Sequence, residues 1–575
     1  MKNGENFFIP FIIAASICLA AISFMHRDSF WISDCGNKFI QTENFLRTGK
    51  LNIDYPAHDV DPDMNYFPYG GHHFMKKDGK IFSFYPPCFP LISAPFYRFF
   101  GFFGLYIIPA LSAALIAGLS ALLFRSSGLK RWNIIGPLAA VLLTPILFYG
   151  MVFWEETPAV ALATLAILIC IKPLRRKRKT SLPFIAAGLI LALSTVLREE
   201  GYILFVALFA GLLFQARDKK ACVFISLGFS AGMVPLWVFQ YLEWGHVLGS
   251  HFQTYSSMEN NMPFSQIIMS KIMNFYVYFL RFTPDWRVGG AFYGMLLFPF
   301  IAATIALVVP RGRIRDAMPL SIIPAAALAS LVNVIILIRT PDIVFSTIFT
   351  QALLPFLPFL IVLLVYGRKL WAMKNPALRL MMIISAAYCV MTPLALNQKD
   401  IGIIWGPRHF LFIVPLLAVL TFASFKFLRR KISPLMKYAT ALLFISSALI
   451  QITGMYALNL KKESSAQIIE HLKKMNSEFV ITDIFWVPED AACLFFGKKF
   501  MLAGASPEKT LAGALRLLKA KGIRNVSLIL SNRYRKISDK DLAEAMRSID
   551  VRHWRELKSP GPEFMNVTIF DCSIR

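Results

Sequence analysis

Several signatures of soluble enzymes are missing from this sequence. The eight cysteines are scattered, with no C-x-x-C pair and no histidines at zinc-binding spacing. The polar C-terminal part contains no G-x-G-x-x-G or Walker sequence, so no nucleotide is assigned to it. Free thiols are the default expectation for all eight cysteines. Two pairs, Cys35 with Cys88 and Cys493 with Cys572, could form disulfides in an oxidising compartment.

Charged residues are scarce as well. They make up 16% of the 575 residues, against 56% hydrophobic residues and a mean hydropathy of +0.56. Apolar runs of roughly 17 to 25 residues recur along the chain, and this is the length of a helix that spans a bilayer. About 13 candidate spans begin near Phe7, Gly104, Asn133, Thr157, Leu182, Gly201, Ala221, Gly289, Met318, Asp342, Leu380, His409 and Tyr438. The sequence therefore predicts a polytopic, all-α membrane protein.

Among the short connections between these spans, those of one alternating set nearly lack positive charge. The connections of one set hold 25 Lys and Arg, whereas the short connections of the other set hold only Arg198, Arg339, Lys399 and Arg408. Lys and Arg mark cytoplasmic loops. The pattern predicts an N-terminus in the cytoplasm and an outer location for everything after Leu460. The formal charge of +26 then reports topology and contact with lipid headgroups, and no nucleic-acid partner is expected.

The composition divides the chain into two predicted domains. Residues 1–459 form the multi-span domain, in which 26–87 and 243–290 are long outer segments, the second rich in aromatic anchors such as Trp244 and Tyr278. Residues 460–575 alternate helical and strand patterns, which predicts a small extracytoplasmic α/β domain. Helices are expected over 464–475, 507–521 and 539–549, and strands over 479–482, 526–530 and 567–570.

Three carboxylates near helix ends on the outer side are candidates for catalysis. Asp34 lies just beyond the first span, and Glu155 and Glu156 lie in a connection of a few residues before Thr157-Pro158. A charged side chain in the middle of a membrane costs roughly 2.5–3.5 kcal/mol, and less near the interface, unless it meets water or a cation. The alternative for the glutamate pair is a helix N-terminal cap, because acids favour the positive end of the following helix.

A few cations share this outer side. Arg198, in the turn 197–201, can form a salt bridge with a neighbouring glutamate or can bind a phosphate bidentately. Gly406-Pro407 predicts a turn that presents Arg408 and His409 at the interface, where lipid headgroups are the alternative partners. A reaction on a lipid-linked phosphate needs both carboxylates and cations. A carboxylate takes the proton of an acceptor hydroxyl, and cations stabilise the departing phosphate.

These segments resemble the GT-C superfamily of integral-membrane glycosyltransferases, in particular relatives of the protein O-mannosyltransferases and of the aminoarabinose transferase of lipid A. The resemblance covers the membrane part. It is carried by Asp34, by Glu155-Glu156, by Leu197-Arg-Glu-Glu-Gly201, by Trp244-Gly-His-Val-Leu-Gly-Ser250 with Tyr255, by Trp405-Gly-Pro-Arg-His409 and by the outer C-terminal domain.

The resemblance implies that a sugar is transferred from a polyprenyl-phosphate donor to the hydroxyl of an acceptor glycan, lipid or protein, usually with inversion. By the same match, Asp34 is the first-loop acid and Glu155 or Glu156 the second-loop acid. Donor-phosphate contacts fall to Arg198, Lys399, Arg408 and His409. Asp34 is followed by Cys35-Gly36 instead of the Asp-Glu or Asp-x-Asp form often seen in the family. A divalent metal such as Mg²⁺ or Mn²⁺ therefore stays an open possibility, and no cofactor is assigned.

Two other classes of function compete with this interpretation. A transporter or flippase for lipid-linked glycans would also be polytopic, but such proteins often show internal repeats and charges inside the helix bundle. This sequence has no clear repeat, and most of its charges stand at helix ends. A scaffold whose outer domain recruits cell-wall enzymes is the third possibility.

Overall fold

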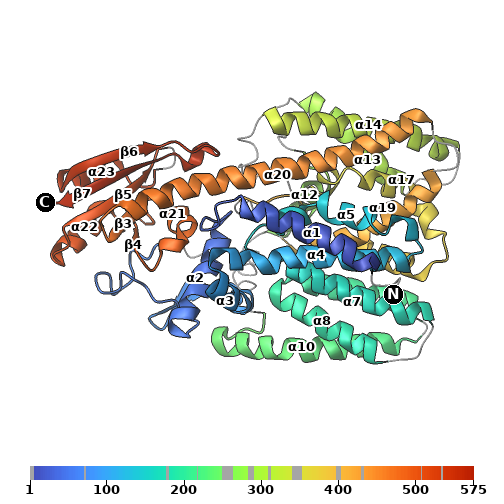
Figure 1. Ribbon diagram of the computed structural model, residues 1–575, viewed down its shortest axis with the longest axis horizontal. Helices are drawn as coiled ribbons and strands as arrows, with labels where there is room; N and C mark the ends of the chain where they lie inside the picture. Colours follow the sequence, from blue (N-terminus) through green and yellow to red (C-terminus); the bar gives the residue numbers. More distant parts are fainter. Residues whose placement is uncertain are drawn as a thin grey trace. The chain divides into compact units, whose positions relative to one another are not determined.

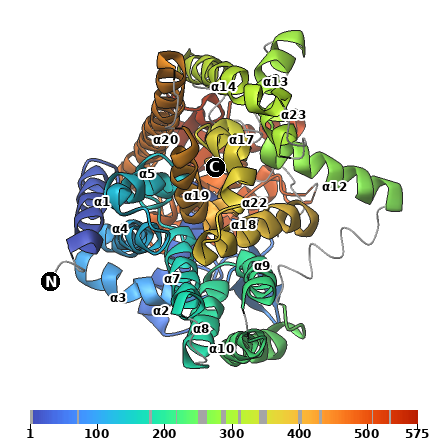
Figure 2. The same cartoon turned by 90° about the vertical axis from the view of Figure 1, so that its right-hand side faces the viewer.

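The structure, a computed structural model, describes residues 5–69, 73–176, 181–216, 218–248, 263–282, 290–307, 313–339, 352–396, 403–428, 433–506, 508–532 and 535–575. The chain divides into two compact units (Figures 1 and 2). One comprises residues 1–21 and 107–455, and the other comprises residues 22–106 and 456–575. The boundaries fall inside long helices, so each of those helices contributes to both units.

Among the described residues, seven helical segments are long and apolar enough to cross a membrane. They lie in α4 (Phe102–Ser126), α7 (Glu156–Arg176), α10 (Lys220–Trp244), α14 (Arg313–Arg339), α18 (Pro376–Ala395), η2 with α19 (Arg408–Ile413 and Val414–Leu428) and α20 (Pro434–Lys474). Four shorter apolar helices are α1 (Glu5–Ser23), α8 (Leu182–Leu197), α9 (Glu200–Gln215) and α13 (Gly290–Ala306). The chain is thus a multi-pass, mostly helical membrane protein, as predicted. The span expected from Asp342 begins in a segment, 340–351, that lies outside the described residues.

The span expected from Asn133 is broken into two short helices. Helix α5 (Ile135–Leu142) ends before Thr144, and α6 (Pro145–Tyr149) starts directly after it. Proline has no N–H and favours the first turn of a helix, while the Thr144 side chain accepts a hydrogen bond from the backbone N–H of Ile146. The chain then runs without regular structure to Glu156, the first residue of α7.

Helices α7, α8 and α10 pack side by side (Figure 2). Two glycines allow α8 and α10 to approach closely. A Cβ added at Gly188 would lie 2.2 Å from the Ile225 carbonyl oxygen, and one added at Gly228 would lie 2.1 Å from the Ile185 carbonyl oxygen. Small residues commonly permit such contacts in membranes, where dispersion forces hold helices together.

The second unit begins with the first long outer segment. It contains α2 (Ser33–Thr48), the antiparallel hairpin of β1 (Phe74–Lys77) and β2 (Lys80–Ser83), and α3 (Cys88–Phe100). Helix α3 covers the apolar segment that precedes the second span. All eight cysteines of the chain are free thiols, so neither proposed disulfide is present.

The C-terminal part of this unit is an α/β domain, as the sequence predicted. Its five-stranded sheet has the order β4-β3-β5-β7-β6, with β3 parallel to β4 and β5, and β7 antiparallel to β5 and β6. The strands are β3 (Phe479–Thr482), β4 (Lys499–Leu502), β5 (Asn525–Ser531), β6 (Ile549–Leu557) and β7 (Val567–Ile574). The sequence prediction missed β4 and β6.

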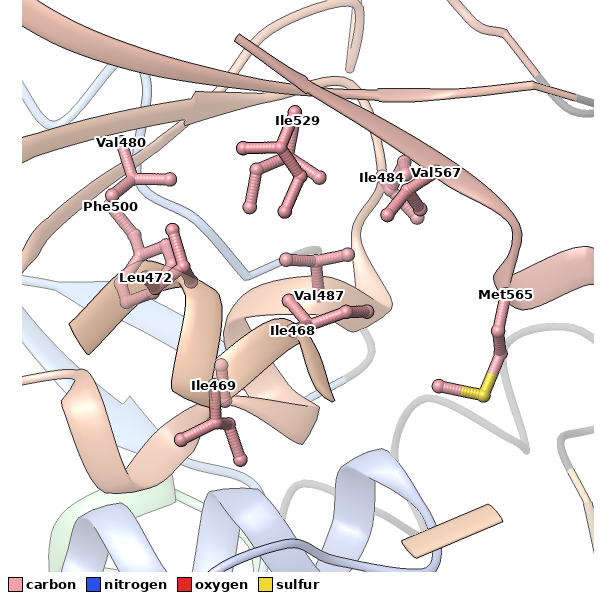
Figure 3. Close-up of a cluster of buried hydrophobic side chains, with 12 residues drawn as sticks. Ile468, Ile469, Leu472, Val480, Ile484, Val487, Phe500, Ile529, Met565 and Val567 are labelled. Carbon is pink, nitrogen blue, oxygen red and sulfur yellow. The ribbon is translucent and has the colours of Figure 1, made fainter. Parts of the chain in front are cut away.

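The last turns of α20 cover one face of this sheet. Ile468 and Leu472 lie between this helix and the strands that carry Val480 and Ile529, and with Ile469 they belong to one buried apolar core (Figure 3). Short helix α21 (Trp486–Asp490) adds to the same core. Helices α22 (Leu511–Ala520) and α23 (Asp539–Arg547) complete the domain, and each is capped by a hydroxyl side chain.

Candidate active site

In the first unit, charged side chains from three connections converge. We call this set the arginine cluster; it consists of Glu155, Glu156, Arg198, Glu200, Arg408 and His409. The glutamates stand where the chain enters helices, since Glu156 opens α7 and Glu200 opens α9. Acidic side chains are favoured at helix N-termini, so the cap predicted for the glutamate pair is present at Glu156. Arg198 and Glu199 are the two residues between α8 and α9.

Arg198 is the centre of the arginine cluster. Its guanidinium lies 2.5 Å from the carboxylate of Glu200 and 3.5 Å from those of both Glu155 and Glu156. All these side chains are buried or nearly so. The salt bridge with a neighbouring glutamate, one of the two roles considered for Arg198, is therefore formed. A guanidinium can serve several acceptors at once because it carries five N–H donors in a planar fork.

Arg408 and His409 join the same cluster from the other side. The Nε of Arg408 lies 3.7 Å from Glu156 Oε1, and its guanidinium stacks 4.8 Å from the ring of Trp154. His409 Nδ1 lies 2.7 Å from Glu200 Oε1. Gly406 makes this possible because its backbone is left-handed, with φ of 67°, as the predicted Gly406-Pro407 turn requires.

Aromatic residues seal the arginine cluster. Tyr278, from α12 (Phe264–Phe279), packs edge-on against the His409 ring at 5.9 Å and is 1% exposed. The sequence suggested a membrane-surface anchor for Tyr278, whereas the structure buries it. Tyr388 donates a hydrogen bond to the His409 carbonyl oxygen. The cluster thus contains three carboxylates and two guanidiniums in a site largely closed to water, where charge pairing is strong.

Asp34 belongs to the second unit and lies in the first turn of α2. The β1–β2 hairpin brings two partners to it, since His73 directly precedes β1 and Tyr85 follows β2 by two residues. The backbone N–H of Phe84 donates to the His73 carbonyl oxygen, which extends the hairpin pairing to this point. Asn37 fixes the hairpin to α2, because its amide donates to the same carbonyl oxygen at 3.1 Å.

The side chains of Asp34, His73 and Glu489, here called the histidine triad, form a line. His73 Nδ1 lies 2.5 Å from Glu489 Oε1, and His73 Nε2 lies 3.7 Å from Asp34 Oδ1. The Tyr85 hydroxyl donates a hydrogen bond to the same Asp34 oxygen at 2.7 Å. Lys38, one turn along α2 from Asp34, places its ammonium 3.9 Å from the centre of the Tyr85 ring.

Burial and charge act in opposite directions on the histidine of the triad. Burial by itself lowers the pKa of His73, but the carboxylates of Glu489 and Asp34 raise it by more, and the pKa is raised overall. Burial also raises the pKa of Glu489, although the contact with His73 opposes this effect. An imidazolium between two carboxylates is the arrangement that these contacts stabilise.

The charged residues of both clusters are poorly suited to a divalent metal. Across the described parts of the chain, no three His, Cys, Asp or Glu side chains converge to hold one. The glutamates of the arginine cluster already face guanidiniums, and the carboxylates of the triad already face an imidazole. These carboxylates therefore do not make up the donor set of a metal centre.

The structure gathers most of the sequence-predicted site residues. It brings together Glu155, Glu156, Arg198, Arg408 and His409, and it places Asp34 in the other unit. Lys399 lies outside the described residues. The sequence prediction missed Glu200 and Glu489. Glu200 stood beside Arg198 in a segment already singled out, whereas nothing near Glu489 in the sequence points to a partner 416 residues away.

Comparison with protein-family models and with curated proteins finds no match. Comparison with solved structures shows a shared fold at low sequence identity, which agrees, at the level of the fold alone, with the resemblance seen in the sequence. The apo structure of ArnT from Cupriavidus metallidurans matches with a TM-score of 0.51 and 12% identity, over 97% of each chain.

Two further structures match with lower scores. ArnT from the same organism bound to undecaprenyl phosphate gives a TM-score of 0.45 at 12% identity, over 97% of each chain. The oligosaccharyltransferase AglB from Archaeoglobus fulgidus, in complex with an inhibitory peptide and a dolichol-phosphate, gives 0.47 at 12% identity, over 91% of this chain and 69% of AglB.

Proposed function

We propose that this protein is an inverting glycosyltransferase. It transfers a sugar from a polyprenyl-phosphate donor to an acceptor hydroxyl at the outer face of a bacterial cytoplasmic membrane. The GT-C fold shared with ArnT supports the class of reaction. The observation that carries the proposal is the setting of Asp34, whose Oδ1 accepts a hydrogen bond from Tyr85 and faces His73. A carboxylate oriented in this way on the first outer loop suits a general base.

The reaction is a single displacement. Asp34 accepts the proton of the acceptor hydroxyl while that oxygen attacks the anomeric carbon of the sugar. The bond between this carbon and the phosphate oxygen breaks, and its electron pair leaves with the polyprenyl phosphate. Attack opposite to the leaving group inverts the anomeric configuration. The negative charge that grows on the phosphate needs cations or N–H donors nearby.

The arginine cluster supplies the proposed cations. Arg408 is the better candidate, because its contact with Glu156 is 3.7 Å long, beyond hydrogen-bond distance, and can be exchanged for a phosphate oxygen. Arg198 holds three carboxylates and can hold the cluster in shape while it shares a remaining N–H with the donor. His409 and Lys399 are proposed as further contacts to the donor phosphate, and Glu155 or Glu156 as the second acid.

The charge pattern of the loops supports the orientation. We place the N-terminus in the cytoplasm and residues 460–575 outside, as an extracytoplasmic α/β domain. The histidine triad combines the first outer segment with this C-terminal domain within one unit, which requires both on the same side of the membrane. The loops poor in Lys and Arg carry the arginine cluster, and the same side is assigned to them.

The test uses cells from which the gene has been removed. Such cells should accumulate a polyprenyl-phosphate sugar, which mass spectrometry of extracted lipids identifies along with the unmodified acceptor. The extracted donor lipid and the unmodified acceptor are then given together to liposomes that contain wild-type protein or Asp34→Asn. Wild type should release polyprenyl phosphate, and Asp34→Asn should be slower by a factor of about 10²–10⁴, the usual contribution of a general base.

The liposome experiment also separates the rival functions. Wild-type rates in Asp34→Asn would refute the base, and wild-type rates in the double substitution Glu155→Gln with Glu156→Gln would refute the second acid. Movement of the donor lipid between leaflets without release of polyprenyl phosphate would establish a flippase instead. Full function of all these variants, with loss only on removal of residues 460–575, would establish a scaffold.

A further inference from the structure

The fully buried carboxylate of Glu489 has a specific partner. Glu489 lies in α21 of the C-terminal domain with 0% exposure, and its Oε1 lies 2.5 Å from His73 Nδ1. A buried carboxylate is unfavourable unless it is paired and hydrogen-bonded. The pairing partner comes from the first outer segment, so the C-terminal domain reaches the surroundings of Asp34 through this histidine.

The contact determines how the imidazole faces Asp34. Which nitrogen of a histidine donates, and in which direction the ring points, is set by the partner of the other nitrogen. With Nδ1 held by Glu489, the opposite nitrogen, Nε2, is directed at Asp34 Oδ1. The backbone of His73 is fixed independently by Asn37, so Glu489 acts on the ring alone.

The packing around Glu489 is too tight for the pair to be incidental. Gly36 of α2 meets the backbone of Glu489 so closely that an added Cβ would lie 1.9 Å from the Glu489 carbonyl oxygen. Tyr69 donates a hydrogen bond to the neighbouring carbonyl oxygen of Pro488 at 3.1 Å. Helix α21 is thus held against the first outer segment by backbone contacts that would persist without the carboxylate.

We infer that Glu489 is a positioning residue for the proposed transfer: its carboxylate holds the His73 ring as an imidazolium that faces and orients Asp34. The inference rests on the proposed function and adds to it a role for the C-terminal domain. His73 is then the group through which Glu489 acts on the base, and loss of either residue weakens the same step.

The charges around His73 set the expected pH dependence. Glu489 faces the ring from α21, and Asp34 and Lys38 face it from α2, while Tyr85 lies beside it after β2. Of these, the two carboxylates favour the imidazolium and Lys38 opposes it. An enzyme that needs the imidazolium loses activity as the pH rises through the pKa of His73. Removal of one carboxylate moves that loss to lower pH.

The experiment measures kcat against pH for wild type and Glu489→Gln, with release of polyprenyl phosphate from the donor lipid extracted from gene-deletion cells as the readout. Glutamine keeps the size and an acceptor oxygen but removes the charge. The alkaline limb of the profile should move to lower pH by about one unit or more, the usual effect of a charged neighbour. Below that limb the rate should stay within a few-fold of wild type. Glu489→Asp should restore part of the shift.

Two further variants make the test independent of folding. Asp490→Asn removes the adjacent buried carboxylate, which pairs with Lys461 and does not contact His73, so its thermal stability should fall while the alkaline limb stays in place. His73→Asn should abolish the limb altogether. Adding Glu489→Gln to His73→Asn should slow the reaction no further, because both act through one contact.

Three outcomes would overturn the inference. They are an unmoved alkaline limb in folded Glu489→Gln, the same shift in Asp490→Asn, and additive rate losses in the double variant. If Glu489→Gln does not fold, a wild-type dependence of kcat on pH in His73→Asn would equally overturn the inference. Wild-type activity of Asp34→Asn is a separate result, which would refute the proposed function and leave the pH data to be explained otherwise.

Discussion

Tyr85 donates a hydrogen bond to Oδ1 of Asp34 at 2.7 Å, although 51 residues separate the two in the chain. Tyr85→Phe removes the hydroxyl and keeps the ring that Lys38 approaches. Because a hydrogen bond to a charged group contributes about 1.5–3 kcal/mol, kcat should fall roughly 10-fold or more. The measurement is release of polyprenyl phosphate in liposomes.

Tyr97→Phe is the matched control for Tyr85→Phe. Its ring packs edge-on against Phe39 in the same unit, and its hydroxyl interacts with Glu43, away from the triad. This variant should keep wild-type kcat. Equal rates for Tyr85→Phe and Tyr97→Phe would show that the Tyr85 hydroxyl does not orient Asp34.

Gly36→Ala should damage both stability and activity. The added methyl would meet backbone atoms of Glu489 at 1.9 and 2.8 Å, and backbone cannot move aside as a flexible side chain can. Overpacking typically costs about 1–3 kcal/mol, and here it also separates α2 from α21. Thermal unfolding in detergent should show a lower midpoint. Gly497→Ala, an exposed glycine whose added Cβ meets only one atom at 3.8 Å, should unfold like wild type.

Arg198→Met should be strongly destabilising. It leaves three carboxylates buried without their shared guanidinium, and the loss of one partner of a buried ion pair costs about 3–5 kcal/mol. Adding Glu200→Gln should recover part of the loss, because one uncompensated charge disappears. Unfolding midpoints of the single and double variants measure the coupling. A cost below about 1 kcal/mol, as expected for the exposed Arg47–Glu43 pair on replacing Arg47, would contradict a tightly paired cluster.

The stability of the protein should fall as the pH rises above neutrality. The pKa of His73 is raised above its ordinary value of 6.5, so the stabilisation from its protonated form is complete below pH 6.5 and is lost as the pH rises through the raised value. The raised pKa of Glu489 acts in the same direction from its ordinary value of 4.5 upward. Each proton contributes a slope of up to about 1.4 kcal/mol per pH unit.

The double variant His73→Asn with Glu489→Gln tests this slope. It removes both titrating groups, so its unfolding midpoint should depend less on pH than that of wild type between pH 6 and 9. A parallel dependence in the two proteins would assign the effect to other groups. Measurements at two salt concentrations check the burial of the pair, since salt screens buried charges only weakly.

Arg408→Lys probes the donor phosphate. Lysine keeps the charge but loses the planar fork that binds phosphate bidentately and stacks on Trp154. The KM for the lipid donor should rise by about 10-fold or more, as expected when a charge-assisted hydrogen bond is lost. An unchanged KM would remove Arg408 from the phosphate site.

Much of the fold could be predicted from hydropathy, because backbone groups in lipid must pair within a helix and the sequence must supply long apolar runs. The break at Thr144-Pro145 escaped prediction, since the apolar run continues across it. Strand β6 escaped too. It is an edge strand whose residues are nearly all exposed, so it lacks the alternation of apolar and polar residues that marks a half-buried strand.

The arginine cluster and the histidine triad differ in how far they could be predicted. The residues of the arginine cluster lie in loops that the charge pattern assigned to the outer side of the membrane. This shared side alone was enough to group Glu155, Arg198 and Arg408 as candidate site residues. The contact of His73 with Glu489 has no local signal. It joins a loop histidine to one of many acids in a soluble domain, and only the packing of α2 on α21 selects it.

The distance in sequence between His73 and Glu489 also sets the interval between the synthesis of the two residues on the ribosome. Glu489 is 416 residues further along the chain than His73, and at about 5–20 residues per second the ribosome needs about 20 to 80 s to reach it. During that interval the first outer segment is already made while its buried partner does not yet exist. An incomplete chain therefore has Asp34 and His73 but not the carboxylate that pairs with this histidine, and the contact can form only after the last domain has been made and folded.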